Sequence, residues 1–162
     1  MTRPNVLLAS SEVFRFAKVG GLGDVAYSLP KALRALGIDA RIIAPMHKKR
    51  GRKIAEFSIR LGEKEVKASI LLSRVDNVPM YLVEGGGYFP RKNVYGYDDD
   101  FERYVFFSKA IVEFIKHERT WKPDILHLND WHTGLTAAYI KQEGLTVKTL
   151  FTIHNLGYQG DV

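Results

Sequence analysis

Five short apolar runs are spaced along the chain, and each is typical of a strand buried on both faces of a parallel sheet. The runs cover residues 5–9, 40–44, 80–83, 124–128 and 148–153. Patterns with helical period separate several of them, over residues 25–36, 98–117 and 133–143. This alternation predicts an α/β fold with a doubly wound, mainly parallel, Rossmann-like sheet.

The helix boundaries can be read from single residues. Asp24 is predicted to cap the first helix, and Gly37 follows its last periodic position. Pro30 lies inside that helix and cannot donate a backbone hydrogen bond, which predicts a kink or a split into two helices. In the second helix the predicted core-facing side chains are Phe101, Tyr104, Val105, Ser108, Ile111, Val112 and Ile115.

The middle of the chain departs from the parallel pattern. Residues 53–61 and 66–75 alternate in part between apolar and polar side chains, and Gly62 lies between them. We predict a β-hairpin insertion with Gly62 in its turn. The 162 residues contain no linker or repeat, so we expect one domain. In such a sheet, ligands are expected at the carboxyl ends of the strands.

Composition excludes several classes of protein. The chain has no cysteine, which rules out a disulfide scaffold and a thiolate metal site. Its 46% hydrophobic residues support a packed core. It lacks an apolar run of membrane length and a secretory signal, so we expect a cytoplasmic protein without membrane contact.

The net charge is +6, and the excess is concentrated in residues 47–53. A nucleic-acid surface would interleave aromatic side chains for base stacking, and this segment has none. We interpret it as a solvated loop, and nucleic acid is not an expected partner.

A glycine-rich segment, residues 18–25 (Lys-Val-Gly-Gly-Leu-Gly-Asp-Val), follows the first predicted strand and opens the first helix. Glycines let backbone N–H groups approach a ligand, the helix start attracts anions, and Lys18 adds a full positive charge. These features predict a phosphate site, with a plain tight turn as the alternative. The glycine spacing does not fit the dinucleotide fingerprint, which argues against a nicotinamide-dependent dehydrogenase.

Two more polar segments, residues 127–132 and 152–160, lie at the predicted carboxyl ends of strands. His127 alternates with apolar neighbours, and we interpret it as a buried, hydrogen-bonded core histidine. Asp130 is placed to cap the third helix. His154 has no obvious packing role after its strand, so we predict a functional one. A metal site is not expected, because the histidines of residues 127–132 lack a ligand spacing and no carboxylate cluster completes a site.

Several segments together resemble the amino-terminal half of bacterial and plant glycogen and starch synthases, glycosyltransferases of family 5 with the GT-B fold. The resemblance is carried, in collinear order, by residues 6–12, 18–25, 29–33, 95–96, 106–110, 127–134 and 151–160. It implies a retaining glucosyltransferase that moves glucose from ADP-glucose or UDP-glucose to the non-reducing end of an α-1,4-glucan. It implies no cofactor or metal besides the sugar-nucleotide donor.

The resemblance also implies roles for individual residues. Lys18 corresponds to the lysine that binds the sugar nucleotide, and the Gly20 and Gly21 amides correspond to those at its phosphates. His154 corresponds to the histidine near the transferred glucose, and the adjacent Asn155 is counted among the substrate-binding residues.

For the acceptor side, the resemblance implies that Asp130 lies at the floor of the same cleft, where it orients His154 or the acceptor. Tyr95 is implied to lie along the groove that binds the glucan acceptor.

The resembled enzymes have a second, nucleotide-binding domain with no counterpart in this sequence. We therefore expect residues 1–162 to be a single, incomplete domain that is inactive alone and needs the missing carboxyl-terminal domain or a partner chain. The alternative is a non-catalytic module that binds phosphate or sugar. An uncovered sheet edge at residues 148–153 predicts self-association.

Overall fold

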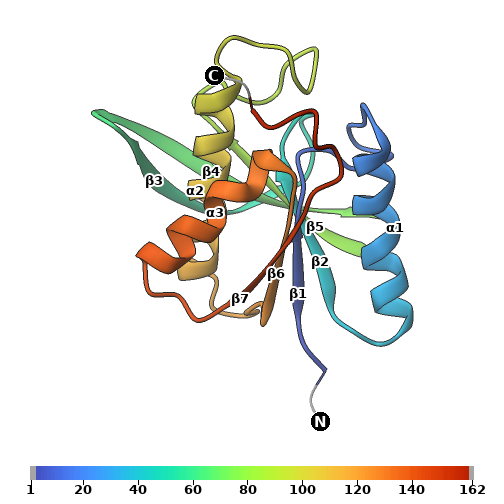
Figure 1. Cartoon of the computed structure of the whole chain (residues 1–162). Coiled ribbons are helices and arrows are strands. Elements are labelled where there is room, and N and C mark those ends of the chain that lie inside the picture. Colours follow the sequence, from blue (N-terminus) through green and yellow to red (C-terminus); the bar gives the residue numbers. More distant parts are fainter. Residues whose placement is uncertain (1–2, 161–162) are drawn as a thin grey trace.

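The computed structural model describes residues 3–160, which form a seven-stranded sheet in the order β3-β4-β5-β2-β1-β6-β7 (Figure 1). The strands are β1 (Val6–Ala9), β2 (Ala40–Pro45), β3 (Arg52–Leu61), β4 (Lys64–Val75), β5 (Val78–Gly85), β6 (Ile125–Asn129) and β7 (Lys148–Thr152). The helices are α1 (Gly21–Ala35), α2 (Asp100–His117) and α3 (Trp131–Gln142). The five strands from β5 to β7 run parallel, which confirms the predicted α/β class.

The parallel strands β1, β2, β5 and β6 are apolar because helices cover both faces of the sheet there. The predicted burial on both faces is wrong for β7, which is mostly exposed at the edge of the sheet. In Figure 1, α1 packs on one face, while α2 and α3 pack on the other. Successive β1 residues belong to the two opposite cores: Leu7 packs on the α2 side and Leu8 on the α1 side, and both are fully buried. A strand enclosed in this way needs apolar side chains at every position, not at alternate ones.

The predicted hairpin is present, with β3 and β4 antiparallel and the turn at Gly62. It is part of a larger unit, because β4 also pairs antiparallel with β5 and the three strands form a meander. Asp76 lies in the tight turn between β4 and β5 with a left-handed backbone (φ 50°). Its carboxylate accepts hydrogen bonds from Arg15, Tyr27 and Lys31, so the turn is fastened to α1 and to the loop after β1.

Helix α1 differs from its prediction in two respects. It runs through Pro30 without a split, so that part of the prediction is wrong; Pro30 has no N–H to donate a helical hydrogen bond, and it is buried. The helix also begins earlier: Gly20 is the N-cap, and Asp24 lies within the first turn instead of capping it. Gly37, with φ 80°, ends the helix as predicted.

Helix α2 has the predicted extent, but its buried face is rotated at the first turn. Phe101 is 48% exposed, whereas Arg103 is fully buried. The buried guanidinium is accommodated because it donates hydrogen bonds to the carbonyls of Tyr88 and Val94 and pairs with Asp100. Helical periodicity cannot predict that loop carbonyls will accept hydrogen bonds from Arg103. The sequence pattern therefore placed the apolar Phe101 in the core and left Arg103 outside it.

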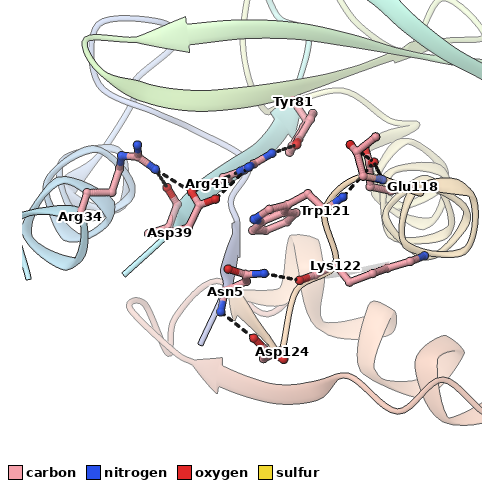
Figure 2. Close-up of polar contacts among 11 residues, drawn as sticks. Asn5, Arg34, Asp39, Arg41, Tyr81, Glu118, Trp121, Lys122 and Asp124 are labelled. Carbon is pink, nitrogen blue, oxygen red and sulfur yellow. Dashed lines mark hydrogen bonds and ion pairs between the residues drawn. The ribbon is translucent and has the colours of Figure 1, made fainter. Parts of the chain in front are cut away.

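Polar contacts hold the side of the sheet where the amino-terminal ends of the parallel strands lie (Figure 2). Asp39 accepts hydrogen bonds from Arg34 and Arg41, and Arg41 also donates to the Tyr81 hydroxyl. Beside them, the Asn5 backbone N–H donates to the Asp124 carboxylate at 2.7 Å. These contacts fix the loops at the amino-terminal ends of the strands. The predicted site residues all lie toward the carboxyl-terminal ends. Within residues 3–160, no helix is both long and apolar enough to cross a membrane.

Candidate active site

The glycine turn, residues 18–23, leads into α1 beyond the carboxyl end of β1. The buried carboxylate of Glu12 occupies the inside of this turn: its Oε2 accepts the Val19 N–H at 2.5 Å and the Gly20 N–H at 2.8 Å. Gly20 therefore already has an acceptor for the amide that the resemblance assigns to a phosphate. Gly21 is the first residue of α1, where backbone N–H groups have no acceptor within the helix.

Lys18 lies on the outside of the turn and is about one-third exposed. Its Nζ contacts both carboxylate oxygens of Asp24, at 2.8 and 2.7 Å, and lies 5.4 Å from the centre of the Phe14 ring. An ion pair as exposed as this one contributes little to stability, so Lys18 can exchange Asp24 for another anion at small cost.

The second group of predicted residues meets at the ends of β6 and β7. The Asp130 carboxylate is buried, and its Oδ1 accepts the His154 N–H at 2.6 Å and the Asn155 N–H at 3.4 Å. The His154 ring is exposed, with its Nε2 2.9 Å from Oδ1 of the fully buried Asn129. Asn129 in turn donates to the Ala9 carbonyl in β1, which links this group to the strand that precedes the glycine turn.

Asp130 has an unusual backbone for its residue type, with φ 56°. It stands at the N-cap position of α3, as predicted, yet its side chain makes no capping hydrogen bond. A left-handed non-glycine residue is strained, and such strain often marks a functional position. Here it turns the carboxylate away from the helix and toward the loop that carries His154.

Tyr95 lies between the residues that precede the glycine turn and the start of α3. Its hydroxyl donates to Glu12 Oε1 at 3.1 Å and is 2.6 Å from the Ser11 hydroxyl. Its ring stacks on the His132 ring, with centroids 4.6 Å apart, at the start of α3. Burial raises the pKa of Tyr95, so the hydroxyl stays protonated and available as a donor.

His127 is buried, and its Nε2 lies 2.8 Å from the Thr152 hydroxyl. Burial lowers its pKa, with a further contribution from His154. The prediction of a hydrogen-bonded core histidine is confirmed.

Sequence reasoning missed a buried cluster of Arg103, His47 and His132. Burial, together with the Arg103 charge, lowers the pKa of His47 to about 4 and that of His132 to about 3, so both rings are neutral at pH 7. Within residues 3–160, Arg103 Nη2 and the Nδ1 atoms of both histidines are buried without a hydrogen-bond partner. The available signal for His47 was its position two residues after a buried strand. The basic run of residues 47–53, in which it lies, obscured that signal.

A hollow of about 290 Å³ opens beside Trp131, between α2, α3 and the segment after β7. None of the predicted site residues lines it, so the hydrogen-bonded groups above define the candidate site better than surface shape does. Among the described residues, no three histidine, aspartate or glutamate side chains are placed to hold a metal ion.

Comparisons with known proteins agree with one another. Residues 5–162 match the family described as the starch synthase catalytic domain. The glycogen synthase of Fusobacterium nucleatum is 44% identical over 164 residues, covering 96% of this chain and 35% of that protein. The glycogen synthase of Clostridium novyi is 42% identical over 169 residues, with the same two coverages.

A solved structure, the catalytic domain of starch synthase IV from Arabidopsis thaliana bound to ADP and acarbose, has the same fold with a TM-score of 0.81. It is 30% identical and is matched over 99% of this chain and 38% of its own length. The chain thus spans about a third of the length of the curated relatives it matches. Because the family model matches from residue 5 to residue 162, the chain belongs to the starch synthase catalytic-domain family.

Proposed function

We propose that this chain is the amino-terminal, donor- and acceptor-contacting part of a glycogen or starch synthase. The complete enzyme would be a retaining glucosyltransferase that moves glucose from ADP-glucose or UDP-glucose to the non-reducing end of an α-1,4-glucan. A second domain, on the same polypeptide or on a partner chain, would bind most of the nucleotide. The relatives are named glycogen synthases, and the Arabidopsis starch synthase was solved with ADP and acarbose, which supports both ligand classes.

The observation that carries this proposal is the way Asp130 holds the loop of His154. Two backbone N–H groups converge on one carboxylate oxygen, and Asn129 contacts the His154 ring at Nε2. Because the Asp130 charge is already committed to these amides, we assign it an orienting role. The loop is thereby set before substrate arrives, as electrostatic stabilisation of a positively charged sugar transition state requires.

On the donor side, bond breaking leaves negative charge on the departing diphosphate. Lys18 and the first N–H groups of α1 are the positive groups at that end. A charge-assisted hydrogen bond from Lys18 is worth about 1.5–3 kcal/mol, which is a clear but partial share of the rate enhancement. The proposal needs no cofactor or metal besides the sugar nucleotide.

A domain-completion experiment tests this function. The chain alone is expected to transfer no labelled glucose from ADP-glucose or UDP-glucose to glycogen. Joined to the remaining two-thirds of the Fusobacterium nucleatum glycogen synthase, it is expected to restore transfer, and Lys18→Ala or His154→Ala should abolish most of it. Lys148→Ala, on the exposed face of β7, is the matched control and should leave transfer unchanged.

Binding of maltoheptaose and ADP, measured on the same fusion by calorimetry, keeps the test informative if catalysis is slow. Binding without transfer would favour the alternative, a non-catalytic sugar- and phosphate-binding module. Transfer by the unfused chain would refute the need for a second domain.

A further inference from the structure

Among residues 3–160, Glu12 is the one side chain hydrogen-bonded both to the glycine turn and to Tyr95. It is 4% exposed and lies just beyond the carboxyl end of β1. One carboxylate oxygen accepts the Val19 and Gly20 N–H groups, and the other accepts the Tyr95 hydroxyl. The two groups that it joins are more than 70 residues apart in the sequence, and they are assigned to opposite substrates.

The glycines of the turn are explained in part by this carboxylate. A Cβ at Gly23 would lie 3.2 Å from Glu12 Oε2 and 2.9 Å from Lys18 Cγ, closer than such atoms normally approach. The turn therefore closes directly on Glu12. Any shift of the carboxylate changes the hydrogen bonds of the residue 19 and 20 amides, because those amides donate to it.

Tyr95 is held from two sides. Its hydroxyl has one proton, so when it donates to Glu12 it accepts from Ser11. A glucan hydroxyl at Tyr95 would compete for that proton. If Tyr95 donates to the sugar, the carboxylate loses one donor, and its bonds to the two remaining amides strengthen because they share the same charge.

We propose that Glu12 is a positioning residue that couples glucan binding at Tyr95 to the order of the glycine turn, and through that turn to the nucleotide sugar. The inference rests on the proposed function, since it takes Tyr95 as an acceptor contact. Coupling between two bound ligands is reciprocal, so a nucleotide that orders the turn raises glucan affinity by the same factor.

The test is amide exchange followed by NMR on the full 162-residue chain, with and without saturating maltoheptaose. In the wild type, glucan is expected to slow exchange of the Val19 and Gly20 amides by roughly fivefold or more, the lower end for coupled sites. Glu12→Gln should speed their exchange roughly tenfold without ligand, because a neutral acceptor replaces a charged one. It should also remove the response to glucan.

Tyr95→Phe leaves the Glu12 charge and the stack on His132 in place, so it serves if Glu12→Gln folds poorly. It should abolish the glucan response at residues 19 and 20. Tyr97→Phe is the matched control. It removes from the same loop a hydroxyl that accepts the Asn93 N–H, and the glucan response at residues 19 and 20 should remain.

The outcomes separate the two claims. Glucan-induced shifts at Tyr95 and His154 with unchanged exchange at Val19 and Gly20 overturn the coupling and leave the proposed function standing. Absence of glucan-induced change anywhere in the chain overturns the acceptor assignment itself. A glucan response that persists in Tyr95→Phe also overturns the coupling, because the signal would then reach the turn by another route.

Discussion

Replacing Asp130 by asparagine isolates the charge that holds the His154 loop. Asparagine tolerates the left-handed backbone at this position and keeps an oxygen acceptor, so the change removes little besides the negative charge. Of the two accepted amides, that of His154 at 2.6 Å is a strong hydrogen bond, while that of Asn155 at 3.4 Å is weak. The cost is therefore dominated by one bond.

Charge-assisted hydrogen bonds contribute about 1.5–3 kcal/mol and neutral ones about 0.5–1.5 kcal/mol, so Asp130→Asn should cost about 1–1.5 kcal/mol. That corresponds to roughly tenfold faster exchange of the His154 amide. Because a loss of 1 kcal/mol lowers the Tm of a domain of this size by about 2–4 °C, Tm should fall by about 2–6 °C.

The assay combines amide exchange, differential scanning calorimetry and glucan binding by the same protein. Asp124→Asn is the control, because Asp124 accepts the Asn5 amide at the opposite edge of the sheet and its loss should leave exchange at residues 154 and 155 unchanged. If Asp130→Asn leaves the His154 amide as protected as in the wild type, the carboxylate does not hold the loop. The orienting role then fails.

Three further predictions concern stability and association. Lys18→Ala should change Tm by less than about 2 °C, because its ion pair with Asp24 is exposed. ADP binding by the domain-completed enzyme should weaken about tenfold or more, and an equal loss of folding free energy and of ADP-binding free energy would contradict a binding role. His47 and His132 are neutral in the fold with lowered pKa values, so the unfolded chain binds more protons, and stability should fall as the pH drops below about 6.5 and level off near pH 3–4. Thermal unfolding across pH 7.5–4 checks this, and a flat profile would show that the histidines titrate normally. The exposed β7 strand should support self-association that Phe151→Lys disrupts; sedimentation showing a monomer at every concentration would argue against it.

Local periodicity predicted the parts of the fold that depend on local burial. The apolar runs became β1, β2, β5, β6 and β7, and for all of these strands except β7 burial under the helices explains the apolar character, whereas β7 is mostly exposed. Helix α1 shows where local rules are incomplete. Pro30 is among the buried residues of α1, which packs on β1, β2 and β5, and the helix continues through it although it cannot donate a helical hydrogen bond.

The candidate site was predictable to the extent that strand ends place residues together. His154 and Asp130 meet because β6 and β7 are parallel neighbours. The role of Glu12 could not be predicted, since its partners include a tyrosine 83 residues away. The burial of Arg103 was missed for the same reason: its carbonyl partners lie in an irregular loop whose path no sequence pattern specifies.

The structure also changes the electrostatic interpretation of the glycine turn. Two of the groups predicted to bind a phosphate already contact a carboxylate of this chain: Lys18 contacts Asp24, and the Gly20 N–H contacts Glu12. The first N–H groups of α1 are the exception. A diphosphate must therefore displace Asp24 from Lys18 and bind mainly at Gly21 and beyond, against two nearby negative charges. Binding energy from elsewhere has to cover that cost, which is a physical reason to expect weak nucleotide binding by this chain alone and tight binding only when a second domain holds the rest of the donor.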